Sequence, residues 1–139
     1  MFRKGVLKVP LLWVLHLGLG YMTFALLYEG LSLYFPVLNS NKEIYHATMA
    51  GGLSIVAIGI MTRVSLGHTG RVIKADKIMV FAYFCVFIGA SIRVFASWLI
   101  PELYDASLHY ASGFWTLGFL IFFIRFFKVL LGPRPDGKA

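Results

Sequence analysis

Four long stretches with almost no formal charge constrain this 139-residue chain more than any other feature. Residues 9–28, 44–62 and 106–124 contain no Asp, Glu, Lys or Arg, and residues 78–101 contain only Arg93. A helix needs about 20 apolar residues to cross a bilayer core, and its backbone groups must be hydrogen-bonded within the segment. We therefore predict an all-α polytopic membrane protein, a single domain built as a four-helix bundle. The expected helices cover approximately 9–35, 44–64, 77–100 and 105–131.

Composition supports a lipid environment. Hydrophobic residues make up 59% of the chain and charged residues only 14%, whereas a soluble domain has about 25% charged residues. This leaves too little polar surface to cover a water-soluble globule. The lipid bilayer is therefore the expected surroundings of the helices.

The distribution of basic residues predicts the orientation of the bundle. The net charge is +7, which would suit a nucleic-acid-binding protein if the charges formed one patch. Instead, the basic residues are unevenly distributed, and the connections 36–43 and 101–104 contain only one of them, Lys42. By the positive-inside rule, both termini and the 64–76 loop should be cytoplasmic, and no nucleic-acid role is expected. Eleven basic residues lie on the predicted cytoplasmic side: Arg3, Lys4, Lys8, Arg63, Arg71, Lys74, Lys77, Arg125, Lys128, Arg134 and Lys138.

Ionisable residues inside the predicted spans are the candidates for function, because such residues are costly in lipid and usually face the bundle interior. At a rise of 1.5 Å per residue, four of them fall at similar heights near the outer leaflet: Glu29, His46, Arg93 and His109. His16 lies closer to the cytoplasmic end of its helix.

Two histidines at one height on facing helices suggest a haem site. Neutral imidazole is a common metal ligand, and haem iron commonly takes a proximal histidine. His46 and His109 are therefore candidate axial ligands on opposite faces of a haem, with Arg93 pairing with a propionate. The alternative is that both histidines hydrogen-bond to interfacial water and that Arg93 forms an ion pair with Glu29.

Small residues one helical turn from these groups can be interpreted in two ways. They let helices approach each other closely, and they equally leave space for a flat cofactor. A second, inner metal site could combine His16 with His68 or Arg63 from the cytoplasmic side.

The segment "VSLGHTGR", 64–71, follows the second apolar stretch. Gly67 suits the C-cap of a helix, and Arg63 and Arg71 can extend to lipid headgroups, but neither role explains His68. The wider segment "MTRVSLGHTGR", 61–71, resembles a signature of the NnrS family of bacterial inner-membrane proteins. Further similar segments are "LHLGLGY" at 15–21, "HATMAGG" at 46–52, "FWTLGF" at 114–119 and "PRPDGK" at 133–138.

The resemblance implies haem b, copper and a link to nitric oxide and nitrosative stress. It also implies that His16, His46 and His68 are the leading ligands. The candidate role of His109 as a ligand is inferred instead from its depth and helical phase. Proteins of the family usually have about three times as many helices, and this chain resembles their C-terminal part. We expect sites shared with the other helices to be absent or to be restored by self-association into a homo-oligomer.

The chain lacks a glycine-rich phosphate loop, paired cysteines and a nucleophile elbow. The leading hypothesis is a haem-binding protein of the bacterial inner membrane that responds to nitric oxide or another diatomic ligand, or takes part in respiratory redox chemistry. The alternative is a non-catalytic membrane subunit or assembly factor whose histidines are structural.

Overall fold

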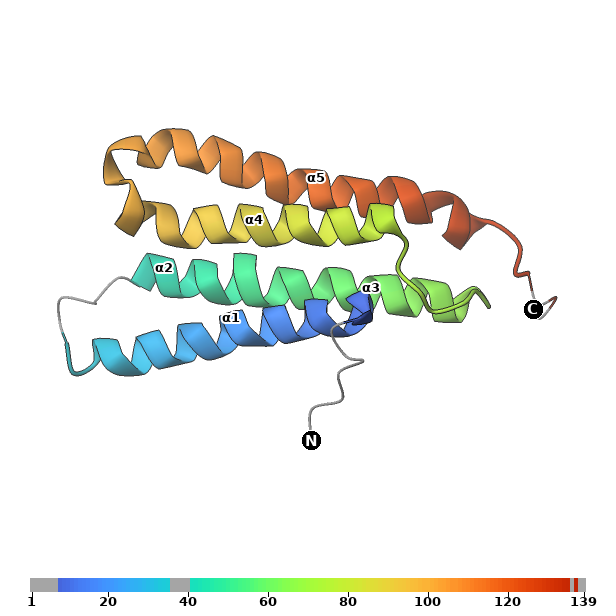
Figure 1. Cartoon of the computed structure of the whole chain (residues 1–139), viewed down its shortest axis with the longest axis horizontal. Helices are drawn as coiled ribbons and strands as arrows, with labels where there is room; N and C mark the ends of the chain where they lie inside the picture. Colours follow the sequence, from blue (N-terminus) through green and yellow to red (C-terminus); the bar gives the residue numbers. More distant parts are fainter. Residues whose placement is uncertain (1–7, 36–40, 136, 138–139) are drawn as a thin grey trace.

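The computed structural model describes residues 8–35, 41–135 and 137, and within them it is helical and contains no strand. The basic residues Arg3, Lys4 and Lys138 lie outside the described residues. Four helices are long and apolar enough to cross a membrane, which confirms the predicted fold class (Figure 1). The elements are α1 Pro10–Ser32, α2 Asn41–His46, the π-helical segment η3 Ala47–Leu53, α3 Ser54–His68, α4 Lys77–Leu99, the short 3-10 turn η4 Pro101–Leu103 and α5 Tyr104–Leu131.

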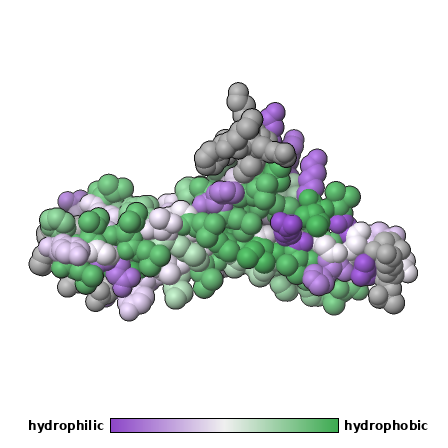
Figure 2. Space-filling view, turned by 90° about the horizontal axis from the view of Figure 1, so that it is seen from below, coloured by the Kyte–Doolittle hydropathy of each residue, from purple (hydrophilic) through white to green (hydrophobic). Residues whose placement is uncertain are grey.

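The second span and α4 form the inside of the bundle. The continuous run α2–η3–α3 packs against α1 and α4, and α5 packs mainly on α4 (Figure 1). Side chains of α1 also meet α4 directly, as the Tyr21 ring does at Phe87. The fully buried side chains come mostly from these inner helices and include Ile55, Ile58, Tyr83 and Val86. Hydrophobic side chains also cover much of the surface between the ends, as a lipid-facing protein requires (Figure 2). The helices therefore pack through their small and branched residues and leave large apolar residues to the lipid.

The second span differs from the predicted helix in length and in geometry. It continues to His68, four residues beyond the predicted end, and it contains a π-helical segment directly after His46. Within it, the Ser54 hydroxyl donates to the carbonyl oxygen of Met49, five residues earlier, at 2.8 Å. Such segments are frequent at functional sites because they redirect the side chains that follow.

Some glycines serve helix packing and others border open space. A Cβ atom on Gly89 would lie 2.7 Å from the backbone oxygen of Ala111 and the backbone nitrogen of Trp115, so α4 and α5 touch there. By contrast, a Cβ atom on Gly20 or Gly113 would meet nothing within 4 Å. Close helix packing is therefore confirmed at Gly89, whereas space for a flat cofactor stays a prediction.

The segment 64–71 forms the C-terminus of α3 and the first part of the loop to α4. Thr69 is the C-cap, and Gly70 follows with a φ of 67°. The Gly70 N–H donates to the Gly67 carbonyl and the Arg71 N–H to the Leu66 carbonyl, which is the Schellman pattern. The predicted C-cap at Gly67 was wrong, because Gly70 is the residue that takes the left-handed conformation.

The loop from α3 to α4 is also tied to the end of α5. The Arg71 guanidinium donates to the carbonyl oxygen of Val129 at 3.4 Å. Asp76 caps α4 by accepting from the Met79 N–H, and it pairs with Arg125 at 2.8 Å. The start of α1, this loop and the end of α5 form one end of the bundle, which we call the basic end (Figure 1).

Candidate functional site

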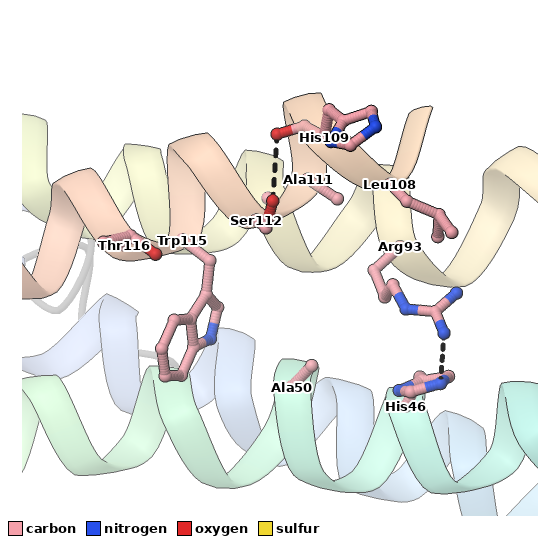
Figure 3. Close-up of a pocket in the computed structure, with 10 residues that line it drawn as sticks. His46, Ala50, Arg93, Leu108, His109, Ala111, Ser112, Trp115 and Thr116 are labelled. Carbon is pink, nitrogen blue, oxygen red and sulfur yellow. Dashed lines mark hydrogen bonds between the residues drawn. The ribbon is translucent and has the colours of Figure 1, made fainter. Parts of the chain in front are cut away.

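A cavity of about 550 Å³ lies between α2–η3, α4 and α5 (Figure 3). It is in the half of the bundle away from the basic end. It brings together three residues that the sequence predicted as a site, His46, Arg93 and His109. Its volume lies within the range of small-molecule and cofactor sites, about 300–1,000 Å³. The remaining lining residues are mostly small or apolar: Ala50, Gly89, Leu108, Ala111, Ser112, Trp115 and Thr116.

Arg93 is held by two partners inside the span. One of its terminal nitrogens donates to Nε2 of His46 at 2.5 Å, and the other donates to the Tyr104 hydroxyl at 2.8 Å. Since a guanidinium can only donate, Nε2 of His46 must accept. The Nε2 lone pair of His46, which a metal ion would need, is therefore engaged by Arg93.

The alternative ion pair between Arg93 and Glu29 is not formed, so that part of the prediction was wrong. Arg93 turns toward α2, where His46 and Tyr104 satisfy its guanidinium. Glu29 lies exposed near the end of α1. Although α1 also contacts α4, it does so through other side chains, such as Tyr28, which stacks on Trp98. Equal depth along the helices did not determine which of them face each other.

His109 lines the same cavity from α5 but is exposed. In Figure 3 its ring lies beside α5 and does not point toward His46. Its carbonyl oxygen accepts from the Ser112 hydroxyl at 3.0 Å. The two imidazoles therefore share a cavity without facing one another.

Trp115 is a site residue that the sequence analysis missed. Its indole Nε1 is buried and has no hydrogen-bond partner among the described residues. In Figure 3 the indole extends from α5 toward the helix that carries Ala50. A buried indole N–H usually finds an acceptor, so a tryptophan within the fourth apolar stretch was the available signal.

The other two histidines lie in separate grooves. His16 lines a groove of about 360 Å³ between α1 and α4 whose walls include the aromatic rings of Phe24 and Phe95. Its Nδ1 donates to the Leu12 carbonyl at 2.7 Å, which requires a proton on Nδ1. His68 lines a third groove at the basic end. The structure therefore does not bring His16 and His68 together.

Among the residues that the structure describes, no group of three or more His, Cys, Asp or Glu side chains is placed to hold a metal ion. A ligand of the main cavity would instead meet two imidazoles and one guanidinium, beside the ring of Trp115 and above a mostly apolar floor. This set of donors suits a flat, largely apolar molecule that carries an anionic or hydrogen-bond-accepting edge.

Comparison with known proteins gives a family assignment. No curated protein and no solved structure matches the chain. The family model described as "NnrS protein" matches residues 2–134, nearly the whole chain, which confirms the resemblance found in the sequence. The chain belongs to the NnrS family of membrane proteins.

Proposed function

We propose that this protein binds haem b in the cavity of His46, Arg93 and His109 and that it serves the nitric oxide chemistry associated with the family. The observation that carries the proposal is the shared cavity, because residues from α2, α4 and α5 line a single space of about 550 Å³. Membership of the NnrS family supports a role related to nitric oxide in a membrane. When bound, haem would supply an iron atom that can take a diatomic ligand and change its oxidation state.

The lining residues fit this cofactor in their chemistry. His46 offers Nε2 to the iron once Arg93 releases it, and the freed guanidinium is suited to a propionate. His109 is the candidate for the second ligand, provided that its ring turns into the cavity. Ala50 and Ala111 present only small side chains to this space.

Optical and electron paramagnetic resonance spectra of the purified protein test the proposal. We expect a Soret band with low-spin character, which His46→Ala and His109→Ala should each abolish. His16→Ala is the matched control, because His16 lies in the groove between α1 and α4. Unchanged low-spin signals in both His46→Ala and His109→Ala would contradict the assignment. Loss of the signal in His16→Ala alone would move the haem to the His16 groove.

The contact between Arg93 and His46 favours a second candidate, a subunit or assembly factor whose histidines are structural. In that case His46 serves to satisfy Arg93 within the span. The protein purified from haem-supplemented cells would then lack a Soret band, and His46→Ala would lower its thermal stability. A haem-dependent change in stability that disappears in His46→Ala would support the first candidate instead.

A further inference from the structure

The His68 groove at the basic end has a different composition from the main cavity. It has a volume of about 390 Å³ and is formed by the end of α3, the following loop and the segment after α5. Three of its lining residues are basic or can become so, and none of the described lining residues is acidic: Arg63, Val64, Gly67, His68, Ile73 and Arg134. Arg63 therefore gives the groove a positive charge that none of its described lining residues offsets.

Charged side chains of the loop and of α5 near the groove have partners within the described part of the protein, whereas those of α3 do not. Arg71 is bonded to backbone carbonyls, and Asp76 and Arg125 neutralise one another. Arg63 and His68 have no hydrogen-bond or ion-pair partner among the described residues and are both exposed. The acidic side chain placed nearby among the described residues, Asp76, is already paired with Arg125, so the described part of the chain offers Arg63 no anion.

The groove also has an apolar part that an inorganic anion would not use. Val64 is 47% exposed and Ile73 is 50% exposed, and both line the same space as the basic residues. The groove lies at the end of the membrane span Lys42–His68, where headgroups meet acyl chains. A phosphate attached to hydrocarbon would contact both parts.

We propose that the groove of Arg63, His68, Ile73 and Arg134 binds the phosphate of an anionic phospholipid, with the start of an acyl chain along Val64 and Ile73. Basic grooves at the membrane surface are suited to such headgroups, and charge-assisted hydrogen bonds from arginine to phosphate are strong. This role accounts for His68, whose imidazole adds a hydrogen-bonding group beside Arg63. It is independent of haem, because the groove is separate from the His46 cavity.

The test is lipid binding by the full chain, measured by native mass spectrometry in detergent with phosphatidylglycerol and phosphatidylcholine as probes. We expect preferential retention of phosphatidylglycerol, and Arg63→Gln should weaken it at least about tenfold, as loss of a charged hydrogen bond predicts. Lys128→Gln is the matched control: it also removes one exposed positive charge near the end of α5, but Lys128 does not line the groove. We expect it to change retention less than about twofold.

Three results would overturn the proposal. Equal weakening by Arg63→Gln and Lys128→Gln would show attraction to general surface charge. Equal retention of the two lipids would show that the headgroup is not recognised. Displacement of the lipid by an excess of inorganic phosphate would show that the hydrocarbon contributes nothing. If Arg63→Gln does not fold, His68→Gln and Ile73→Ser serve instead, because both replace exposed side chains of the groove and both should weaken retention.

Discussion

The His46 cavity and the His68 corner at the basic end both contain arginine and histidine, but the two regions use them in opposite ways. In the cavity, Arg93 lies within a membrane span and is held by His46 and Tyr104. At the corner, the polar side chains that hold the fold together are bonded to backbone or to each other, as Arg71 is to Val129. Arg63 and His68 remain exposed there.

The difference shows where a polar residue indicates a ligand. Inside the span most polar groups bond within the protein, and Trp115 Nε1 is one of the few buried exceptions among the described residues, which makes it a candidate for contact with a ligand of the cavity. At the membrane surface, water and headgroups can satisfy any side chain. An exposed charge there indicates a ligand only when a groove and an apolar wall accompany it.

The largest loss of stability should come from a substitution that pushes apart α4 and α5, two of the helices that enclose the cavity. Gly89→Leu places a side chain against the backbone of Ala111 and Trp115, which lie 2.7 Å from the position of a Cβ atom. Overpacking of this kind costs up to about 3 kcal/mol, and it would also abolish binding in the cavity. Thermal unfolding in detergent checks the prediction. Gly113→Leu is the control, because a Cβ there meets nothing within 4 Å; similar losses in both variants would contradict the role of close packing.

The next effect concerns the pairing inside the cavity. Arg93→Leu should destabilise the protein by about 1–3 kcal/mol, because it leaves His46 and Tyr104 without their shared donor. The double variant His46→Leu, Arg93→Leu should lose less than the sum of the two single variants. Strict additivity in this double-mutant cycle, measured by chemical unfolding, would mean that the contact between the two residues is not energetically coupled.

These two predictions rest on features that the sequence revealed to different degrees. The four helices follow from charge-free stretches of about 20 residues, because lipid forces such stretches into helices. Depth along each helix brought His46, Arg93 and His109 to one height, and the structure places all three around one cavity. The pairing of Arg93 with His46 rather than Glu29 depends on which faces of the packed helices meet, and depth carries no information about that.

Other parts of the site depend on local backbone geometry. The π-helical segment after His46 shifts the phase of the second span, so a regular helical count misassigns the faces beyond it. The choice of Gly70 over Gly67 as the left-handed residue depends on where α3 ends, and two glycines three positions apart are equally suitable in composition. The sequence therefore predicts which residues are polar and how deep they lie, and packing decides which of them meet.

A smaller effect is expected at the corner, where Asp76 joins α4 to α5. Burial alone would raise the pKa of Asp76, but the Met79 N–H and Arg125 outweigh it and hold the pKa below its ordinary value. Because the folded pKa is the lower one, this stabilisation is complete above the unfolded pKa of about 4 and is lost as pH falls through the folded value. Asp76→Ala should cost about 1 kcal/mol through loss of the cap.

Asp76→Asn separates the cap from the ion pair. Asparagine can still accept from the Met79 N–H but cannot pair with Arg125. The stability of this variant at neutral pH should lie between those of wild type and Asp76→Ala, and it should fall less than wild type on acidification. Unfolding curves at neutral pH and near pH 3 provide the measurement. An unchanged acid sensitivity in Asp76→Asn would assign that sensitivity to other carboxylates.

The last prediction concerns the orientation of the protein in the membrane and involves no change in stability. Lys42 and the 82% exposed Val72 lie at opposite ends of the bundle, and the buried native thiol can be removed by Cys85→Ala. From the positive-inside rule we expect a membrane-impermeant maleimide to label Lys42→Cys in intact cells. Val72→Cys should react only after permeabilisation, because the basic end is predicted to be cytoplasmic. The reverse pattern would place the basic end outside, and the phospholipid proposed for the His68 groove would then belong to the outer leaflet.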